Sequence, residues 1–499
     1  MCEFCKEMSR RTFLGASTAL SGGLLLNALS TSAAAAPDLT GEWSKQPPVR
    51  IYVVYLGTVG FYPRPSFDSS AAIENVYAPC LEAAAKKLGD VEFIGKDHIA
   101  NDPNAANQLM SKIVDQKADA VLVIHLTAGW SQPFDIFAST GLPVAVYSQP
   151  LAGHDWGHVP FKQRAGAKII MSVSRDRNEI QRLAGLLRAP ARMKSAKLIV
   201  VGVPGCADGS PAARDYAKIK EKFGTEIVHI TPEEVIEVHQ TITDDEAIAE
   251  AENYWIKPAI EVREPAREEI IKACKVHFAL KKLMIKHQSR TITVKCLGGI
   301  IENIGFPCLS LCRTLDDGGV GTCQADMDAA LTMMLMLYAT GLPGFMFNMN
   351  LDMSMNAIIG THCVAPTKMD GPQSQRLPFV VRSHTETERG VALEVLMDRD
   401  ADREITWARL SNNNEILVGS GIMRGGYDFE DRGCRTRFIA ELTSSTVREL
   451  FEKVSGNVTG TPWVPLLHRI MFYGNHMDNF RDLAQLMELK FMIEGKDMA

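Results

Sequence analysis

Apolar runs alternate with amphipathic stretches from residue 50 onward. The first run, Arg50–Leu56, ends at Gly57, and unbroken apolar runs of this length are typical of parallel strands that are buried on both faces. This alternation predicts a doubly wound α/β domain over residues 37–165. The strand-like runs are 50–56, 119–126 and 143–147, and the helical stretches between them are 75–88 and 105–116.

The same alternation starts again after residue 165. It predicts a second α/β domain over residues 166–307, which ends with the strand-like run 291–295. Its other expected strands are 168–173, 197–203 and 226–230, and its expected helices are 178–187 and a long charged region, 244–286.

The pattern changes character near Cys308. An apolar helix over residues 326–338 is followed by runs that alternate between apolar and polar positions, as in half-buried strands. Residues 308–499 are therefore expected to form a mainly antiparallel β domain. The predicted fold class is two doubly wound α/β domains followed by this C-terminal β domain. Its clearest strand-like runs are 379–382, 391–396, 405–410 and 438–442.

The N-terminus has the features of an export signal. Arg10 and Arg11 precede a weakly apolar stretch, 16–29, and the small-residue run Ala33–Ala36 follows it. This order predicts a twin-arginine signal peptide over residues 1–36 and a periplasmic or otherwise extracytoplasmic mature protein. The alternative is a membrane anchor, but the stretch is interrupted by polar residues and glycines and is short of the roughly 20 residues that a spanning helix needs.

Composition and charge narrow the function classes. Apolar residues make up 46 % and charged residues 22 % of the 499 residues, as in ordinary globular proteins. The formal net charge is −6, and no Lys/Arg cluster with interleaved aromatics is present, which argues against a nucleic-acid partner. Of the 11 cysteines, Cys2 and Cys5 fall in the signal, and the remaining nine cannot all pair. We expect mostly buried free thiols, because no spacing of a structural zinc site is present.

Short motifs follow one another in the last third of the chain. They are Pro307-Cys308, Leu315-Asp316-Asp317-Gly318, Cys323-Gln324-Ala325-Asp326, Thr340-Gly341-Leu342-Pro343, Phe347-Asn348, Gly360-Thr361-His362, and His468 before the helix 478–487. The order up to Asn348 resembles the L-fucose isomerases, and Gly360-Thr361-His362 is similar to a Gly-Ser-His segment of the L-arabinose isomerases. A late His before a C-terminal helix resembles both families. The chain is thus similar to an exported, divergent member of this family, and the resemblance covers most of residues 50–495.

The resemblance implies an L-fucose isomerase-like fold and a homo-trimer or hexamer. It also implies an aldose–ketose isomerisation in which a divalent ion such as manganese chelates two oxygens of an open-chain sugar. By residue matching, the metal ligands of the family fall on Gln324, Asn348, His362 and His468. The acid that follows the first ligand falls on Asp326. Both acidic ligands of the family are therefore amides in this chain.

The amides change the expected chemistry. Amide oxygens bring no negative charge and cannot act as bases near neutral pH, so binding of Mn²⁺ should be weak, whereas Zn²⁺ could still be held by histidines. Two hypotheses follow. The first is an exported enzyme acting on a sugar or sugar derivative, with an altered metal site or with His362 and His468 as its catalytic groups. Gln324, Asn348 and Asp326 would then bind the substrate. The alternative is a non-catalytic sugar-binding protein that retains the pocket but not the proton transfer.

Overall fold

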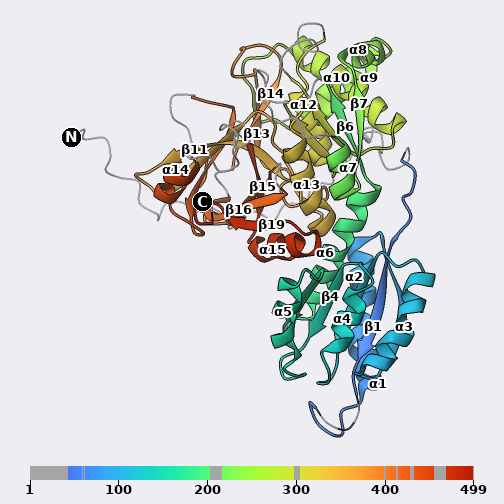
Figure 1. Ribbon diagram of the computed structural model, residues 1–499. Coiled ribbons are helices and arrows are strands. Elements are labelled where there is room, and N and C mark those ends of the chain that lie inside the picture. The colour runs from blue at the N-terminus through green and yellow to red at the C-terminus, as the bar shows by residue number, and fades with distance from the viewer. Residues whose placement is uncertain are drawn as a thin grey trace, which may run out of the picture. The chain divides into compact units, whose positions relative to one another are not determined.

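The computed structural model describes residues 43–58, 60, 62–202, 216–296, 304–397, 400–411, 414–426, 432–454 and 468–497 (Figure 1). The predicted signal peptide, residues 1–36, lies outside this part of the chain. Among the helices in these ranges, none combines the length and the apolar character that a membrane crossing requires.

The first sheet has five parallel strands in the order β2-β1-β3-β4-β5. The chain order reverses between β1 and β3, and the loops after these two strands diverge there, which is where doubly wound sheets commonly bind ligands. The strands are β1 Val49–Leu56, β2 Val91–Ile99, β3 Ala120–His125, β4 Val144–Ser148 and β5 Ile169–Val173.

Helices cover both faces of this sheet, as the alternation of apolar and amphipathic stretches predicted. One face packs against α3 (Pro103–Asp115), α4 (Gln132–Ala138) and α5 (Val159–Arg164). The opposite face packs against α2 (Ala78–Leu88) and the long helix α6 (Asn178–Ser195). The expected strands at 50–56, 119–126 and 143–147 are confirmed to within about one residue at each end.

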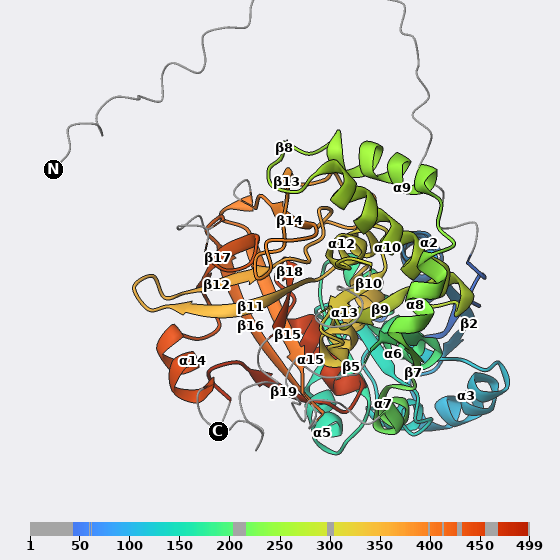
Figure 2. The ribbon, with the colours of Figure 1, turned by 90° about the horizontal axis from the view of Figure 1, so that it is seen from above.

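The second sheet has four parallel strands in the order β10-β9-β6-β7. It takes its edge strand β10 from beyond residue 308, whereas the expected strand 168–173 pairs in the first sheet as β5. Figure 2 shows α10 running beside α12 in this part of the chain. The strands are β6 Lys197–Val201, β7 Glu226–Ile230, β9 Thr291–Val294 and β10 Val320–Cys323. The helices are α7 Tyr216–Phe223, α8 Pro232–His239, α9 Asp244–Glu250, α10 Arg267–Lys286, α12 Cys308–Asp316 and α13 Met327–Thr340.

The helix α6 of the first sheet packs directly against α13. At Gly185 a Cβ atom would lie 2.2 Å from the carbonyl oxygen of Ala339, so the two backbones approach too closely for any side chain at this position. Glycine at residue 185 therefore sets the distance between the two helices.

Six antiparallel strands of the last third close into a barrel. They follow the ring order β15-β18-β11-β12-β17-β16, and a pairing between β15 and β16 completes the ring. A further strand, β19 (Lys490–Ile493), joins β16 in parallel. The barrel strands are β11 Phe345–Asp352, β12 Ala357–His362, β15 Glu404–Leu410, β16 Glu415–Met423, β17 Thr436–Leu442 and β18 His468–Tyr473.

Aromatic side chains fill the inside of the barrel. The rings of Phe347 and Phe438 lie 5.0 Å apart across the intervening strand β12, where Gly360 leaves the space they need: a Cβ there would lie 2.1 Å from Phe438. Trp407 packs over Gly419 in the same way, since a Cβ atom added at Gly419 would lie 2.3 Å from the Trp407 ring. Residues on the opposite face of these strands point outward. The helix α13 covers part of this outer face, and Thr332 of α13 accepts a hydrogen bond from the backbone N–H of Leu410.

Three short strands and two helices lie outside the two parallel sheets and the barrel. β13 (Phe379–Arg382) pairs with β14 (Ala392–Val395) and with β8 (Glu261–Val262) in a small separate sheet. The helices α14 (Val447–Val454) and α15 (Met477–Leu486) lie before and after β18 in the sequence.

The predicted L-fucose isomerase-like fold class is wrong. It expected two doubly wound α/β domains and then a mainly antiparallel domain, but the antiparallel strands form a closed six-stranded barrel and the segment 308–340 completes the second parallel sheet. The physical reason is that alternation identifies a strand with one buried face but does not identify its pairing partners. The pairings of β18 with β11 and β15, without which the ring does not close, join segments that are distant in the sequence and leave no local signal.

Candidate functional site

The candidate site lies where the carboxyl end of β10 meets the outer face of the barrel. Gln324 directly follows β10, and Asp326 caps the N-terminus of α13 through its side chain. On the barrel, Asn348 and His468 are directly opposite each other on β11 and β18, and His362 is the last residue of β12. The imidazole rings of His362 and His468 lie 5.5 Å apart. The structure therefore brings His362, His468 and Asp326 together, with Asn348 opposite His468 and Gln324 two residues before Asp326 in the chain.

His468 is held by a buried carboxylate. Its Nδ1 lies 2.9 Å from Oδ2 of Asp326, and Arg409 donates to the same oxygen at 2.9 Å and to the backbone carbonyl of His468 at 3.1 Å. Burial alone would raise the pKa of Asp326, but the charge of Arg409 and the hydrogen bond from His468 hold that pKa well below its usual range. Because Asp326 is ionised, it accepts the proton of Nδ1, and Nε2 of His468 keeps its lone pair.

His362 has the opposite tautomer. Its Nδ1 accepts a hydrogen bond from the backbone N–H of Val364 at 3.0 Å, so in the neutral ring the proton is on Nε2. Burial, and then the nearby His468, lower the pKa of His362 well below its usual value. Burial also lowers the pKa of His468, despite the carboxylate of Asp326. Both rings are therefore neutral near pH 7, one as a hydrogen-bond acceptor and the other as a donor.

The backbone at Gln324 is in an uncommon conformation. Gln324 and Ala325 have φ values of +60° and +53°, so two consecutive residues other than glycine lie in the left-handed region. Such residues cost roughly 1–3 kcal/mol each and tend to persist at sites where the orientation of a side chain matters. This turn places the Gln324 side chain between the end of β10 and the start of α13.

Three buried polar atoms of the site have unmet hydrogen bonds. They are Nε2 of His468, Oε1 of Gln324 and Oδ1 of Asn348, and within the described chain none of them has a hydrogen-bond partner. An unsatisfied buried polar group costs about 1–3 kcal/mol, so each of these three atoms needs an explanation. All three are acceptors, and Nε2–H of His362 adds one donor.

The donor set does not fit a hard divalent cation. Such ions are held chiefly by anionic oxygen, and the four predicted ligands carry no charge. The lone pair of His362 Nδ1 is already used by Val364, which leaves one imidazole nitrogen and two amide oxygens. Across the described residues, no three or more His, Cys, Asp or Glu side chains are grouped in a way that could hold a metal ion.

Arg409 was not among the residues that the sequence motifs singled out. Asp326 was expected among the substrate-binding residues, but its two oxygens already accept from His468, Arg409 and the backbone N–H of Ala329. Asp326 therefore orients His468. Arg409 lies within a barrel strand, where its residue type gave no signal that its guanidinium would reach Asp326.

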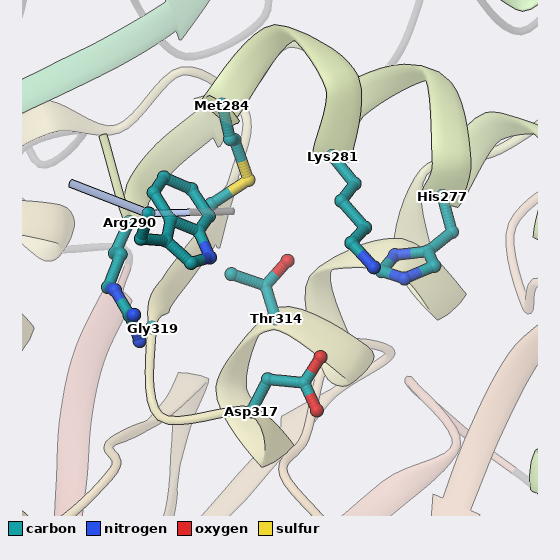
Figure 3. A pocket seen from close by; sticks show the side chains of 8 residues that line it. His277, Lys281, Met284, Arg290, Thr314, Asp317 and Gly319 are labelled. Carbon is teal, nitrogen blue, oxygen red and sulfur yellow. The ribbon is translucent and has the colours of Figure 1, made fainter. Parts of the chain in front are cut away.

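Three cavities of the described chain lie away from this site. The first, lined by α10, α12 and Trp43 (Figure 3), has a volume of about 30 Å³, which is room for about one water molecule. The second has about 200 Å³ and lies beyond the carboxyl ends of β3 and β4, where His125 and Arg177 contribute to its polar lining. The third has about 190 Å³, and Arg182 and Asn479 contribute to its lining. The second and third are large enough for a small organic ligand.

Comparisons with known proteins gave only remote likenesses. No model of a known protein family matches the chain, and no curated protein matches it. Among solved structures, the glucose-galactose binding protein GanP from Geobacillus stearothermophilus is 16 % identical, with a TM-score of 0.16. That match covers 59 % of this chain and 92 % of GanP.

Two further structures are similar to the same degree. A periplasmic solute-binding protein from Actinobacillus succinogenes 130z with bound D-allose is 13 % identical, with a TM-score of 0.17, over 59 % of this chain and 92 % of that one. A carbohydrate transporter from Acidothermus cellulolyticus 11B in complex with myo-inositol is 13 % identical, with a TM-score of 0.18, over 59 % and 88 %. TM-scores this low do not establish a shared fold, and the resemblance to isomerases stays a prediction.

Buried neutral histidines should make the protein sensitive to acid. The pKa values of His277, His362 and His468 are lowered by burial, so the unfolded chain takes up protons near its ordinary pKa of about 6.5 that the folded chain does not. The contribution of these histidines to the free energy of unfolding is therefore fully present above about pH 6.5. Below that pH the contribution decreases, by up to about 1.4 kcal/mol per pH unit for each histidine. We expect the Tm to fall between pH 7.5 and 5.5.

Calorimetric unfolding at these two pH values checks this expectation. His277→Gln removes one of the three groups at a distance from the candidate site and should reduce the difference in Tm. An equal Tm at both pH values would contradict the assigned protonation states.

Proposed function

We propose that the protein binds a sugar or a related polyol at the site formed by Gln324, Asn348, His362 and His468. The observation that carries the proposal is the set of three buried acceptor atoms without partners, on His468, Gln324 and Asn348. Hydroxyl groups on neighbouring carbons of one ligand can donate to all three, and a ligand oxygen can accept from Nε2–H of His362. Each satisfied acceptor would recover part of the roughly 1–3 kcal/mol that it costs unpaired.

The charge of the site favours a neutral ligand. Three acceptors would repel a phosphate or carboxylate, and without an anionic ligand atom the site would hold Mn²⁺ or Mg²⁺ weakly. A polyol needs neither charge nor metal. The three remote structures are described with sugar ligands, although their likeness is too low to support the proposal. Export through the twin-arginine pathway and assembly into a trimer or hexamer stay predictions.

Titration calorimetry of the mature chain tests the proposal. The ligands are D-galactose, D-allose, L-fucose, L-arabinose and myo-inositol, with Mn²⁺ and inorganic phosphate as charged comparisons. We expect at least one sugar or polyol to bind, and the double variant Gln324→Leu with Asn348→Leu to bind it at least about 10-fold more weakly. Phosphate or Mn²⁺ binding more tightly than every polyol would overturn the proposal.

A second candidate function is acid–base catalysis, and the opposite tautomers of the two histidines favour it. Nε2 of His468 could take the proton from C2 of an open-chain aldose, while Nε2–H of His362 donates a hydrogen bond to the carbonyl oxygen at C1, on which negative charge develops. Transfer of the C2 hydroxyl proton to the C1 oxygen and return of the proton from His468 to C1 then give the ketose and restore His468 to its neutral form. Asp326 would stabilise the imidazolium of His468 in between.

Proton NMR in deuterium oxide separates the two candidates. Catalysis predicts exchange of the C2 hydrogen of a bound aldose and formation of ketose, and both should be lost in His468→Gln. Binding of a sugar with no exchange at C2 over many hours would leave the protein as a sugar-binding protein.

A further inference from the structure

Four thiols lie at strand ends beside the candidate site. Cys296 follows β9 by two residues, and Cys323 is the last residue of β10 and precedes Gln324. Cys363 follows His362, and Cys434 precedes β17 by two residues. All four are free cysteines, and all but Cys434 are buried. The site is thus flanked by cysteine side chains from both the parallel sheet and the barrel.

The sulfurs of Cys296 and Cys323 are in direct contact. They lie 2.9 Å apart, with the Cys323 thiol as donor, and the two residues are 3 % and 5 % exposed. The contact follows from the topology, because β9 and β10 are adjacent parallel strands with Val294 opposite Cys323. A disulfide needs an S–S distance of about 2.05 Å, so a sulfur movement of less than about 1 Å would suffice.

A second pair of cysteines, Cys363 and Cys434, lies on the barrel. The Cys434 thiol donates a hydrogen bond to Cys363, and the pairing of His362 with Thr436 places the ends of β12 and β17 side by side. The two pairs differ in exposure, since Cys434 is partly exposed whereas Cys296 and Cys323 are both buried. This second pair is therefore an internal comparison for the first.

We propose that Cys296 and Cys323 are a site of reversible disulfide formation that fixes the position of Gln324. The oxidant is an external disulfide, either oxidised glutathione or the disulfide of a thiol–disulfide oxidoreductase. The thiolate of one cysteine attacks it to give a mixed disulfide and one free thiol. The other cysteine then displaces the second thiol. Two thiols of the protein lose two electrons and two protons, and the external disulfide is reduced to two thiols.

The consequence for the site follows from the backbone. Cys323 directly precedes the two left-handed residues, Gln324 and Ala325, and the disulfide would tie the start of this strained turn to the neighbouring strand. The covalent link closes a loop in the unfolded chain, which lowers the entropy of unfolding. The oxidised protein should therefore have a higher Tm, by at least about 3 °C, and dithiothreitol should reverse the shift.

Peptide mapping by mass spectrometry tests the proposal on the full mature chain. The protein is incubated with oxidised glutathione, unfolded, alkylated and digested. We expect a peptide that links Cys296 to Cys323 and two fewer alkylated thiols, and the Tm shift should vanish in Cys323→Ser but persist in Cys274→Ser. Cys274 is a buried thiol on α10 and serves as the matched control.

Alkylation of both Cys296 and Cys323 after this treatment would overturn the proposal, and so would a Cys363–Cys434 linkage alone. The mapping of wild-type protein needs no variant, so it stays decisive if Cys323→Ser does not fold. It also needs no sugar, so its failure and the failure of the proposed function are separate results.

Discussion

Replacing Arg469 with methionine is expected to lower the free energy of unfolding by about 3–5 kcal/mol. Arg469 donates through Nε to Oε1 of Glu494 at 2.9 Å, and Trp407 donates to the other carboxylate oxygen at 2.8 Å. Arg469 and Glu494 are 1 % and 0 % exposed. Without the guanidinium, the carboxylate would be buried with no counter-charge and would have to take up a proton to remain inside.

Chemical denaturation of the mature protein measures this loss. The double variant Arg469→Met with Glu494→Gln removes both charges, so it should recover a large part of the stability that the single variant loses. If the free energy of unfolding fell by less than about 0.5 kcal/mol in Arg469→Met, the expectation that Glu494 needs the charge of Arg469 to remain buried would be contradicted.

Replacing Asp326 with asparagine is expected to weaken sugar binding by about 10- to 100-fold, since hydrogen bonds to charged groups contribute about 1.5–3 kcal/mol. Without the carboxylate, the proton of His468 is no longer held on Nδ1. The ring can then carry it on Nε2, which converts the acceptor in the site into a donor. The variant should also be less stable, because Arg409 loses the carboxylate that it contacts through two nitrogens.

Asp328→Asn is the matched control for this variant, because Asp328 is a buried carboxylate on the same first turn of α13. Titration calorimetry is run at a temperature at which circular dichroism shows both variants to be folded. We expect Asp328→Asn to keep the affinity of the wild type. Equal affinities in the two variants would contradict the role of Asp326 in orienting His468.

The parts of the fold that the sequence predicted are those with local signals. The strand Arg50–Leu56 was recognisable because both of its faces are buried, which makes every position from Ile51 to Leu56 apolar. The edge strand β2 was missed, because most of its residues are at least partly exposed and its sequence alternates irregularly. Closure of the barrel depends on the pairing of β18 with β11 and β15, from which it is distant in the sequence, and on glycines opposite aromatic rings, and neither is a local property.

The sequence motifs singled out Gln324, Asn348, His362 and His468, and their role as one ligand site stays a prediction. The sequence alone could not show which of their atoms would remain unpaired in the fold. The tautomer of His362 depends on the backbone N–H of Val364, and that of His468 depends on Asp326. Arg409 reaches this group across 59 residues of chain, a contact that only the tertiary structure determines.

The most direct test of the proposed ligand site is a crystal structure of the mature protein with the sugar or polyol that binds most tightly. We expect ligand hydroxyls within about 3 Å of Nε2 of His468 and of at least one amide oxygen, Oε1 of Gln324 or Oδ1 of Asn348. A sugar seated instead in the cavity lined by His125 and Arg177, with Nε2 of His468 still without a partner, would contradict it.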